Sequence, residues 1–216
     1  LMVKLYSEEV DPRCDIILDH SASMAAGSER KAAAAFALTA LLAHAAVNAG
    51  FSLAVWHAGE KLEREPSPQH PQEWRNTDFT SQSNPGEALV GSPGLFQNRG
   101  IRIAVTDLLW AEPPEHFLRR IADGAMRVLI VELLTQNELA PENRGNIALY
   151  DVETGEEREL FFDEALCRRY KERLARHREL WERTADEYGI ALIRLTLEDF
   201  LPSWDLSEFF RCGILK

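Results

Sequence analysis

Short apolar runs alternate with longer amphipathic or alanine-rich stretches along this chain, which is the pattern of a fold whose strands and helices follow one another. Strands are predicted at five apolar runs, namely 16–18, 51–57, 101–106, 128–133 and 191–195. Helices are predicted between them, over 29–49, 113–122 and 163–188. Because a helix between two strands implies a parallel crossover, the sequence predicts an α/β fold with a mainly parallel sheet.

Two segments interrupt this alternation. Residues 66–84 are rich in Pro, Gln, Asn, Ser and Thr without a sustained period, so they predict a long loop. The runs 148–152 and 158–162 flank Thr154-Gly155 and predict a β-hairpin before the last long helix. A short edge strand is expected at 62–65, and a short helix beginning at Pro85 follows the loop.

Composition narrows the class of protein. With 216 residues the chain has the length of one α/β domain, which we expect to span residues 1–216. A net charge of −11 argues against a nucleic-acid or anionic membrane surface, since either needs a basic field. Three scattered cysteines indicate neither a disulfide framework nor a zinc site, and fit a reducing cytoplasm. No apolar run approaches the roughly 20 residues of a membrane span, so direct membrane insertion is not expected.

The segment Asp19-His20-Ser21-Ala22-Ser23 directly follows the first apolar run and places one carboxylate and two hydroxyls at alternate positions. Alternate side chains of an extended or tightly turning segment project to one side, so these oxygens can converge. Asp107 stands in the same position after the strand 101–106. Ligands of open α/β sheets bind beyond the carboxyl ends of strands, and hard oxygen ligands suit Mg²⁺ or Mn²⁺. The pattern therefore predicts a divalent-cation site, with simple capping of a turn by the serines as the alternative.

The strand leading into D-x-S-x-S, the alanine-rich helix, the hydroxyl-bearing loop and the strand ending at Thr106-Asp107 together resemble the von Willebrand factor A domain, with its metal-ion-dependent adhesion site. That resemblance implies a three-layer, doubly wound, mainly parallel sheet, here with a β-hairpin insertion before the long C-terminal helix. In the second half, Glu138-Leu139-Ala140-Pro141, the segment 151–156 and the helix near Tyr170 resemble the bacterial family called domain of unknown function 58. The resemblance covers essentially the whole chain, although members of that family usually carry an additional N-terminal segment.

The resemblance also implies a ligand set for the metal, drawn from three loops: Asp19, Ser21, Ser23, Ser83 and Asp107. The family pattern in the second loop is Thr followed five residues later by Ala-Leu, and counting back from Ala88-Leu89 gives Ser83. Serine keeps the hydroxyl of threonine but not its rigidity, so Thr77 and Thr80 remain rival ligands. Both aspartates are expected to act partly through bound water.

The function implied by the resemblance is a non-enzymatic protein-interaction module. A divalent ion that protein ligands only partly neutralise attracts an acidic side chain of a partner. The resemblance further implies a MoxR-type AAA+ ATPase, or its client, as the partner, in the cytoplasm. Trp110 lies three residues beyond Asp107 and is either an exposed contact residue or packed on the helix that begins near Pro113.

Two other function classes stay open. An Mg²⁺-dependent hydrolase or phosphotransferase could use the same oxygens to hold a phosphate, but the sequence carries none of the usual phosphate-binding or nucleophile motifs. His20 could serve as its base, yet the alternation that gathers Asp19 and the serines directs His20 away, so no catalytic residue is assigned. A metal-free scaffold with a degenerate site is the third class, favoured by serine in place of threonine at position 83.

Overall fold

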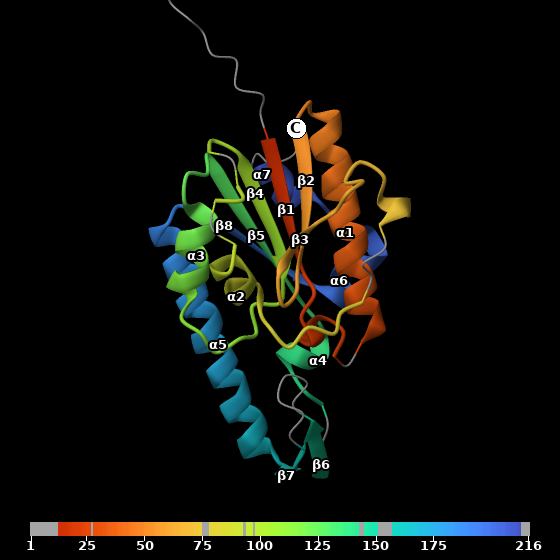
Figure 1. The fold of residues 1–216 in the computed structure, drawn as a ribbon. Coiled ribbons are helices and arrows are strands. Elements are labelled where there is room, and N and C mark those ends of the chain that lie inside the picture. Colours follow the sequence, from red (N-terminus) through yellow and green to blue (C-terminus); the bar gives the residue numbers. More distant parts are fainter. Residues whose placement is uncertain are drawn as a thin grey trace, which may run out of the picture.

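A six-stranded sheet in the order β3-β2-β1-β4-β5-β8 forms the centre of the computed structural model, which describes residues 13–26, 28–74, 78–92, 94–96, 98–142, 145–150 and 157–212. Every neighbouring pair in this sheet is parallel except β2 and β3, which are antiparallel. The predicted α/β fold with a mainly parallel sheet is thus confirmed, and its layout is consistent with a Rossmann-like or von Willebrand factor A-like arrangement (Figure 1).

The bounds of the central strands and of the long helices lie close to the predicted ones. The first hairpin strand, however, is Gly145–Tyr150 instead of 148–152, and the short helix Gln136–Leu139 was not predicted. The strands of the central sheet are β1 (Arg13–Asp19), β2 (Ser52–Ala58), β3 (Leu62–Arg64), β4 (Ile101–Thr106), β5 (Arg127–Leu134) and β8 (Ala191–Thr196). The helices are α1 (Glu29–Asn48), α2 (Pro85–Val90), α3 (Pro114–Ala122), α4 (Gln136–Leu139), α5 (Glu164–Glu187), α6 (Leu197–Ser203) and α7 (Ser207–Arg211). Two 3₁₀ turns, η1 (Ala22–Met24) and η2 (Pro71–Glu73), lie in the loops.

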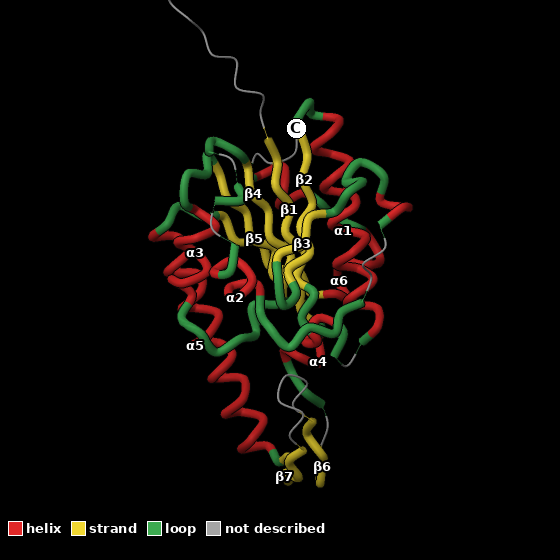
Figure 2. The backbone as a smooth tube through the Cα atoms, viewed as in Figure 1, coloured by secondary structure: helices red, strands yellow, loops and turns green. Residues whose placement is uncertain are grey.

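Helices cover both faces of the sheet, and two apolar clusters fill the two interfaces. In β1 the side chains of Ile16 and Leu18 belong to one cluster and that of Ile17 to the other, because successive side chains of a strand alternate between faces. The first cluster packs under α1, α6 and α7, and the second under α2, α3 and α5. Figure 2 shows the sheet between these two helical layers. A strand buried on both faces reads as a continuous apolar run, which is why the pattern located these strands.

Contrary to the expectation that no segment approaches the length of a membrane span, the alanine-rich helix α1 is long and apolar enough to cross a membrane, judged by length and composition alone. In the structure it packs on the sheet as a core helix, with Ala35, Leu38 and Leu42 buried. Ser28 occupies its N-cap position, but the Ser28 side chain makes no capping hydrogen bond.

The strands β6 (Gly145–Tyr150) and β7 (Glu157–Phe162) form a separate antiparallel pair. This pair lies beyond the carboxyl end of the main sheet, beside the start of α5 (Figure 1). The predicted turn at Thr154-Gly155 falls outside the described residues.

The order of the strands fixes where a site can form. The chain winds from β1 to β2 and β3 in one direction, and later from β4 to β5 and β8 in the other. The crevice between the carboxyl ends of β1 and β4 is therefore the switch point at which doubly wound sheets bind their ligands. Asp19 and Asp107 lie at that point.

The burial of α1 predicts how two leucines on the same helix differ. Leu38 is fully buried and Leu41 is 37% exposed. Leu38→Ala should lower the free energy of unfolding by about 2–5 kcal/mol, because it removes transfer energy and leaves a cavity. The matched control Leu41→Ala should change it by less than about 1 kcal/mol in urea titrations. Equal losses for the two variants would contradict this packing of α1.

Candidate metal site

Two neighbouring parallel strands bring the first and third predicted loops together. Strand β1 ends at Asp19 and β4 ends at Thr106, and the register pairs Leu18 with Val105. The Thr106 hydroxyl (Oγ1) donates to Asp19 Oδ2 at 2.6 Å, so the two strand ends are joined directly. The backbone N–H of Ser21 donates to Asp19 Oδ1 at 2.8 Å. Both oxygens of the Asp19 carboxylate are thus held in fixed directions.

Asp19 is a buried carboxyl group for which the described residues provide no counter-ion. Its side chain is fully inaccessible to solvent, and among the described residues no Lys, Arg or His lies within ion-pair distance of it. Burial raises the pKa of Asp19 to about 7, and the negative charge of Asp107 adds to this rise, although the hydrogen bonds from Thr106 and Ser21 lower it. A nearby cation would stabilise the ionised form.

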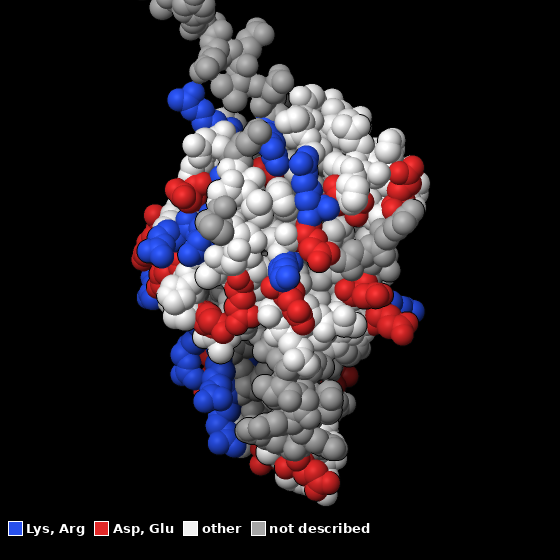
Figure 3. Space-filling model, in the orientation of Figure 1, with Lys and Arg blue, Asp and Glu red and all other residues white. Residues whose placement is uncertain are grey.

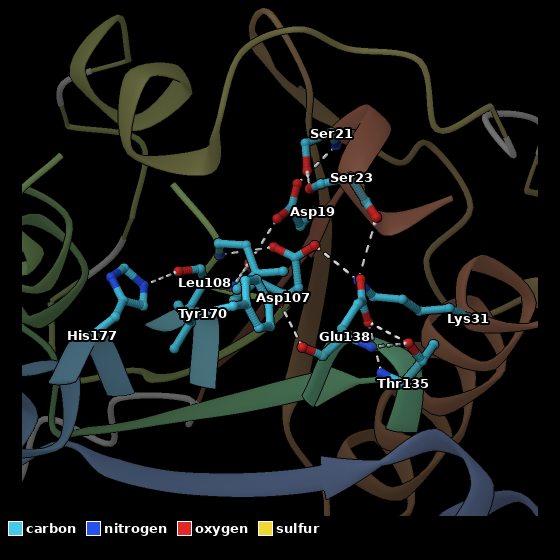
Figure 4. A network of polar contacts seen from close by, with 12 residues as sticks. Asp19, Ser21, Ser23, Lys31, Asp107, Leu108, Thr135, Glu138, Tyr170 and His177 are labelled. Carbon is cyan, nitrogen blue, oxygen red and sulfur yellow. Dashed lines mark hydrogen bonds and ion pairs between the residues drawn. The ribbon is translucent and has the colours of Figure 1, made fainter. Parts of the chain in front are cut away.

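The two serines of the first loop lie next to this carboxylate. Ser21 precedes the 3₁₀ turn η1, and Ser23 lies within it. Their hydroxyl oxygens are 2.9 Å apart, and Figure 4 shows both on the same side as Asp19. The structure therefore brings together the three oxygen-bearing side chains that the D-x-S-x-S pattern predicted to converge.

Asp107 is held by a tight turn after β4. The N–H of Leu109 donates to Asp107 Oδ1 at 3.0 Å. Between them Leu108 is fully buried and has a φ of 57°, the left-handed conformation that costs a non-glycine residue roughly 1–3 kcal/mol. His177 on α5 lies with Nε2 2.7 Å from the Leu108 carbonyl oxygen, which helps to fix this backbone. The surrounding packing thus maintains a strained turn that directs Asp107 into the site.

The sequence did not predict Lys31 as part of this site. Its side chain is fully buried, and its ammonium (Nζ) lies 2.9 Å from Asp107 Oδ2 and 2.6 Å from Glu138 Oε1. It also donates to the Ser23 carbonyl oxygen at 3.3 Å. Burial lowers the pKa of the Lys31 amine, but the two carboxylates outweigh that effect and the pKa is raised overall, which keeps the ammonium charged. Figure 4 shows Lys31 between Asp107 and Glu138.

Glu138 is fixed from a different part of the chain. It belongs to α4, where it forms a capping box with Thr135, whose hydroxyl accepts from the Glu138 N–H at 3.1 Å. The Tyr170 hydroxyl of α5 donates to the Glu138 carbonyl oxygen at 2.6 Å. The ion pair with Lys31 therefore connects the site to α4 and α5.

The second loop reaches the first through its backbone. Ser81 forms an isolated parallel bridge with Ser21, in which the Ala22 N–H donates to the Ser81 carbonyl at 2.7 Å. The predicted ligand Ser83 is half-buried, and its N–H donates to Ser81 Oγ at 3.1 Å. Among the described contacts, none joins the Ser83 hydroxyl to Asp19, Ser21 or Asp107. Its role as a ligand therefore stays a prediction.

The structure describes one of the two rivals of Ser83. Thr80 is exposed, and Thr77 lies outside the described residues. The N-cap of α2 is Asn84.

His20 lies on the opposite side from the site oxygens, as the alternation predicted. Its Nδ1 donates to the Asp78 carbonyl at 2.9 Å, its Nε2 lies 2.7 Å from His57 Nδ1, and its ring stacks on Phe79. His57 Nε2 is in turn 3.1 Å from Glu65 Oε2. These contacts attach the first loop to the second and leave His20 no direct access to Asp19.

Trp110 is not an exposed contact residue. Only 5% of its surface is accessible, and its ring meets Phe117 and Trp181 edge to face. The packed alternative for Trp110 is correct, since α3 and α5 enclose it.

The donor set suits a small hard cation. Among the described residues, no group of three or more His, Cys, Asp or Glu side chains is placed to hold a metal ion, so hydroxyls would have to contribute. Hydroxyls and carboxylates are the ligands that Mg²⁺ and Mn²⁺ accept. A cation beside Asp19, Ser21 and Ser23 would also compensate the buried Asp19 charge, and in that respect the residues fit such an ion.

Residues 1–180 match the family described as "Protein of unknown function DUF58". The chain belongs to the DUF58 family. No curated protein matches this DUF58 chain. The family description itself gives no function.

Solved structures similar to this DUF58 chain include the conserved hypothetical protein BatB from Bacteroides thetaiotaomicron, at 14% identity and TM-score 0.41, covering 93% of this chain and 99% of that one. An aerotolerance-related membrane protein from Bacteroides fragilis, with multiple mutations to serines, matches at 14% identity and TM-score 0.43, covering 94% and 96%. Proximal thread matrix protein 1 from the mussel byssus matches at 16% identity and TM-score 0.42, covering 57% and 37%. These matches are too distant to bear on function.

The buried His20 predicts a pH dependence of stability. Burial lowers its pKa to about 4 from the ordinary value of 6.5, so below pH 6.5 the unfolded chain binds a proton that the folded chain does not. Stability should therefore fall as the pH falls from about 6.5 to about 4, by roughly 1–3 kcal/mol from this group. Urea titrations in chelator at several pH values measure the fall. This loss of unfolding free energy should be smaller in His20→Gln than in wild type. The control His70→Gln, at an exposed position, should lose as much as wild type. Equal losses in His20→Gln and wild type would contradict the role of His20.

Proposed function

We propose that this DUF58 chain is a protein-interaction module that binds an acidic side chain of a partner through a divalent cation at the carboxyl ends of β1 and β4. Mg²⁺ is the expected ion, with Mn²⁺ as its substitute. Asp19, Ser21 and Ser23 would hold it, with Asp107 and a hydroxyl of the second loop, Ser83, completing the set. When bound, the ion supplies a positive charge that the protein ligands neutralise only in part.

The observation that carries the proposal is the buried Asp19 carboxylate, which has hydrogen bonds but no counter-ion among the described residues. Burial raises the pKa of Asp19 to about 7, so its ionised form is costly in the absence of a positive charge, and a bound cation would remove that cost. The hydroxyls of Ser21 and Ser23 beside it are neutral ligands. They add coordinating oxygens without adding negative charge, so an ion bound there keeps attraction for an outside carboxylate.

A lysine could in principle meet the partner's carboxylate without any metal. Lys31 does not fit that role, because its side chain is fully buried and already lies against Asp107 and Glu138. A cation bound from solution in the crevice between the ends of β1 and β4 is the better candidate for contact with the partner's carboxylate.

The partner class comes from the family resemblance. We infer that a MoxR-type AAA+ ATPase, or a client of one, binds at this rim in the cytoplasm. A non-enzymatic role is favoured by the position of His20, which contacts Asp78 and His57 instead of the site oxygens.

Figure 3 shows the exposed Lys and Arg side chains of α5 gathered on one flank of the molecule, although the net charge of the chain is −11. A partner is therefore expected to meet separate basic and acidic areas.

Adding metal should stabilise the protein in an Asp19-dependent way. At Mg²⁺ or Mn²⁺ concentrations of about 100 times the Kd, the melting temperature of wild type should rise by roughly 5–10 °C, because the ion binds only the folded state. Asp19→Asn should show no rise, whereas the exposed-site control Asp186→Asn should respond as wild type does. Thermal melts with and without chelator measure this. Equal rises in wild type and Asp19→Asn would reject the site.

Binding of the partner should depend on the same ion. Immobilised wild type should retain a purified MoxR-type ATPase in Mg²⁺ and lose it in chelator, while Asp19→Asn should retain little in either buffer. Retention that is unchanged by chelator and by Asp19→Asn would contradict metal-bridged binding. Phosphate release from a phosphatase substrate that is lost in Asp19→Asn would instead favour the hydrolase class.

A further inference from the structure

We propose that Lys31 is the residue that sets how strongly, and for which ion charge, the site binds a cation. This inference rests on the proposed function, since it concerns the same site. It assigns the lysine a role as a fixed internal cation that competes with the bound ion for Asp107.

The position of Lys31 is unfavourable for a lysine on two counts. It is fully buried, and it is the third residue of α1, in the first turn of the helix. The dipole of a helix disfavours a positive charge in its first turn. Neither burial nor helix stability therefore explains a lysine here, and its contacts with Asp107 and Glu138 must do so.

These contacts fix the net charge of the site. Asp19, Asp107 and Glu138 carry three negative charges when ionised, and Lys31 contributes one positive charge. Removing the ammonium therefore makes the surroundings of the ion one unit more negative. That change strengthens the binding of a trivalent ion more than the binding of a divalent one.

The ammonium also shares a ligand with the ion. Asp107 Oδ2 is 2.9 Å from Lys31 Nζ, so this oxygen is occupied before any metal arrives. A cation that recruits Asp107 must weaken that ion pair and must stay close to another positive charge. Both effects lower the affinity for the ion, and Coulomb's law makes the second effect proportional to the charge of the ion.

Glu138 acts in the opposite direction. Its carboxylate holds the other side of the ammonium, at 2.6 Å, and thereby leaves Asp107 less tightly bound to Lys31. Neutralising Glu138 should strengthen the ion pair between the Lys31 ammonium and Asp107. It should also remove one negative charge from the site. Both changes disfavour the metal.

The test measures the affinity for Mn²⁺ by calorimetry and for Tb³⁺ by luminescence in the full chain. Lys31→Met should bind Mn²⁺ at least tenfold more tightly than wild type. The gain for Tb³⁺ should be larger, up to about thirtyfold for a tenfold gain with Mn²⁺, because the Coulomb part of the effect scales with ion charge. The matched control Lys171→Met removes the same charge from an exposed position on α5 and should change either affinity by less than twofold.

The larger gain for Tb³⁺ separates this role from a merely structural one, since a loosened fold would not favour the trivalent ion. Mn²⁺ binding by wild type that is lost in Asp19→Asn, together with an unchanged or weaker affinity in Lys31→Met, would overturn the role of Lys31 and leave the proposed function intact. No Mn²⁺ binding by wild type or by Lys31→Met would overturn both.

Should Lys31→Met fail to fold, Glu138→Gln provides the second test in a chain that keeps the lysine. It should bind Mn²⁺ at least threefold more weakly than wild type, with a circular dichroism spectrum like that of wild type. An affinity equal to or higher than that of wild type would overturn the inference.

Discussion

Two carboxylates buried side by side are the constraint on which this end of the molecule depends. Asp19 and Asp107 follow neighbouring parallel strands, so the register of the sheet itself holds them at the switch point. The protein compensates Asp107 with the Lys31 ammonium, but among the described residues it meets Asp19 with hydrogen bonds alone. Hydrogen bonds orient a carboxylate without neutralising its charge. Protonation near pH 7 or a cation from solution would complete this balance.

The rest of the fold keeps the carboxylates from moving apart. The left-handed Leu108 is fully buried and its carbonyl oxygen contacts His177, so the turn that carries Asp107 is fixed from α5. On the other side, the contacts of His20 with Asp78 and His57 attach the first loop to the second. A site supported in this way is arranged before its ligand arrives, which reduces the loss of conformational entropy on binding.

Much of this arrangement could be predicted from local sequence. The buried strands read as apolar runs because both of their faces are covered, and Asp19 and Asp107 follow two of those runs directly. Lys31 gave no such signal, since its carboxylate partners are 76 and 107 residues away and it lies in an alanine-rich helix. The second loop was ambiguous for a related reason. It contacts the first loop through the backbone of Ser81, and a backbone contact of this kind cannot be predicted from the types of the side chains.

The proposed function requires a divalent ion beside Asp19 and the two serines. Crystals grown in Mn²⁺ test it most directly, because anomalous scattering locates the ion independently of any assumed ligand. We expect a single strong peak within about 2–2.5 Å of the hydroxyl oxygens of Ser21 and Ser23, next to Asp19. A map with no anomalous peak at the ends of β1 and β4, and with Asp19 bonded only to protein and water, would contradict it.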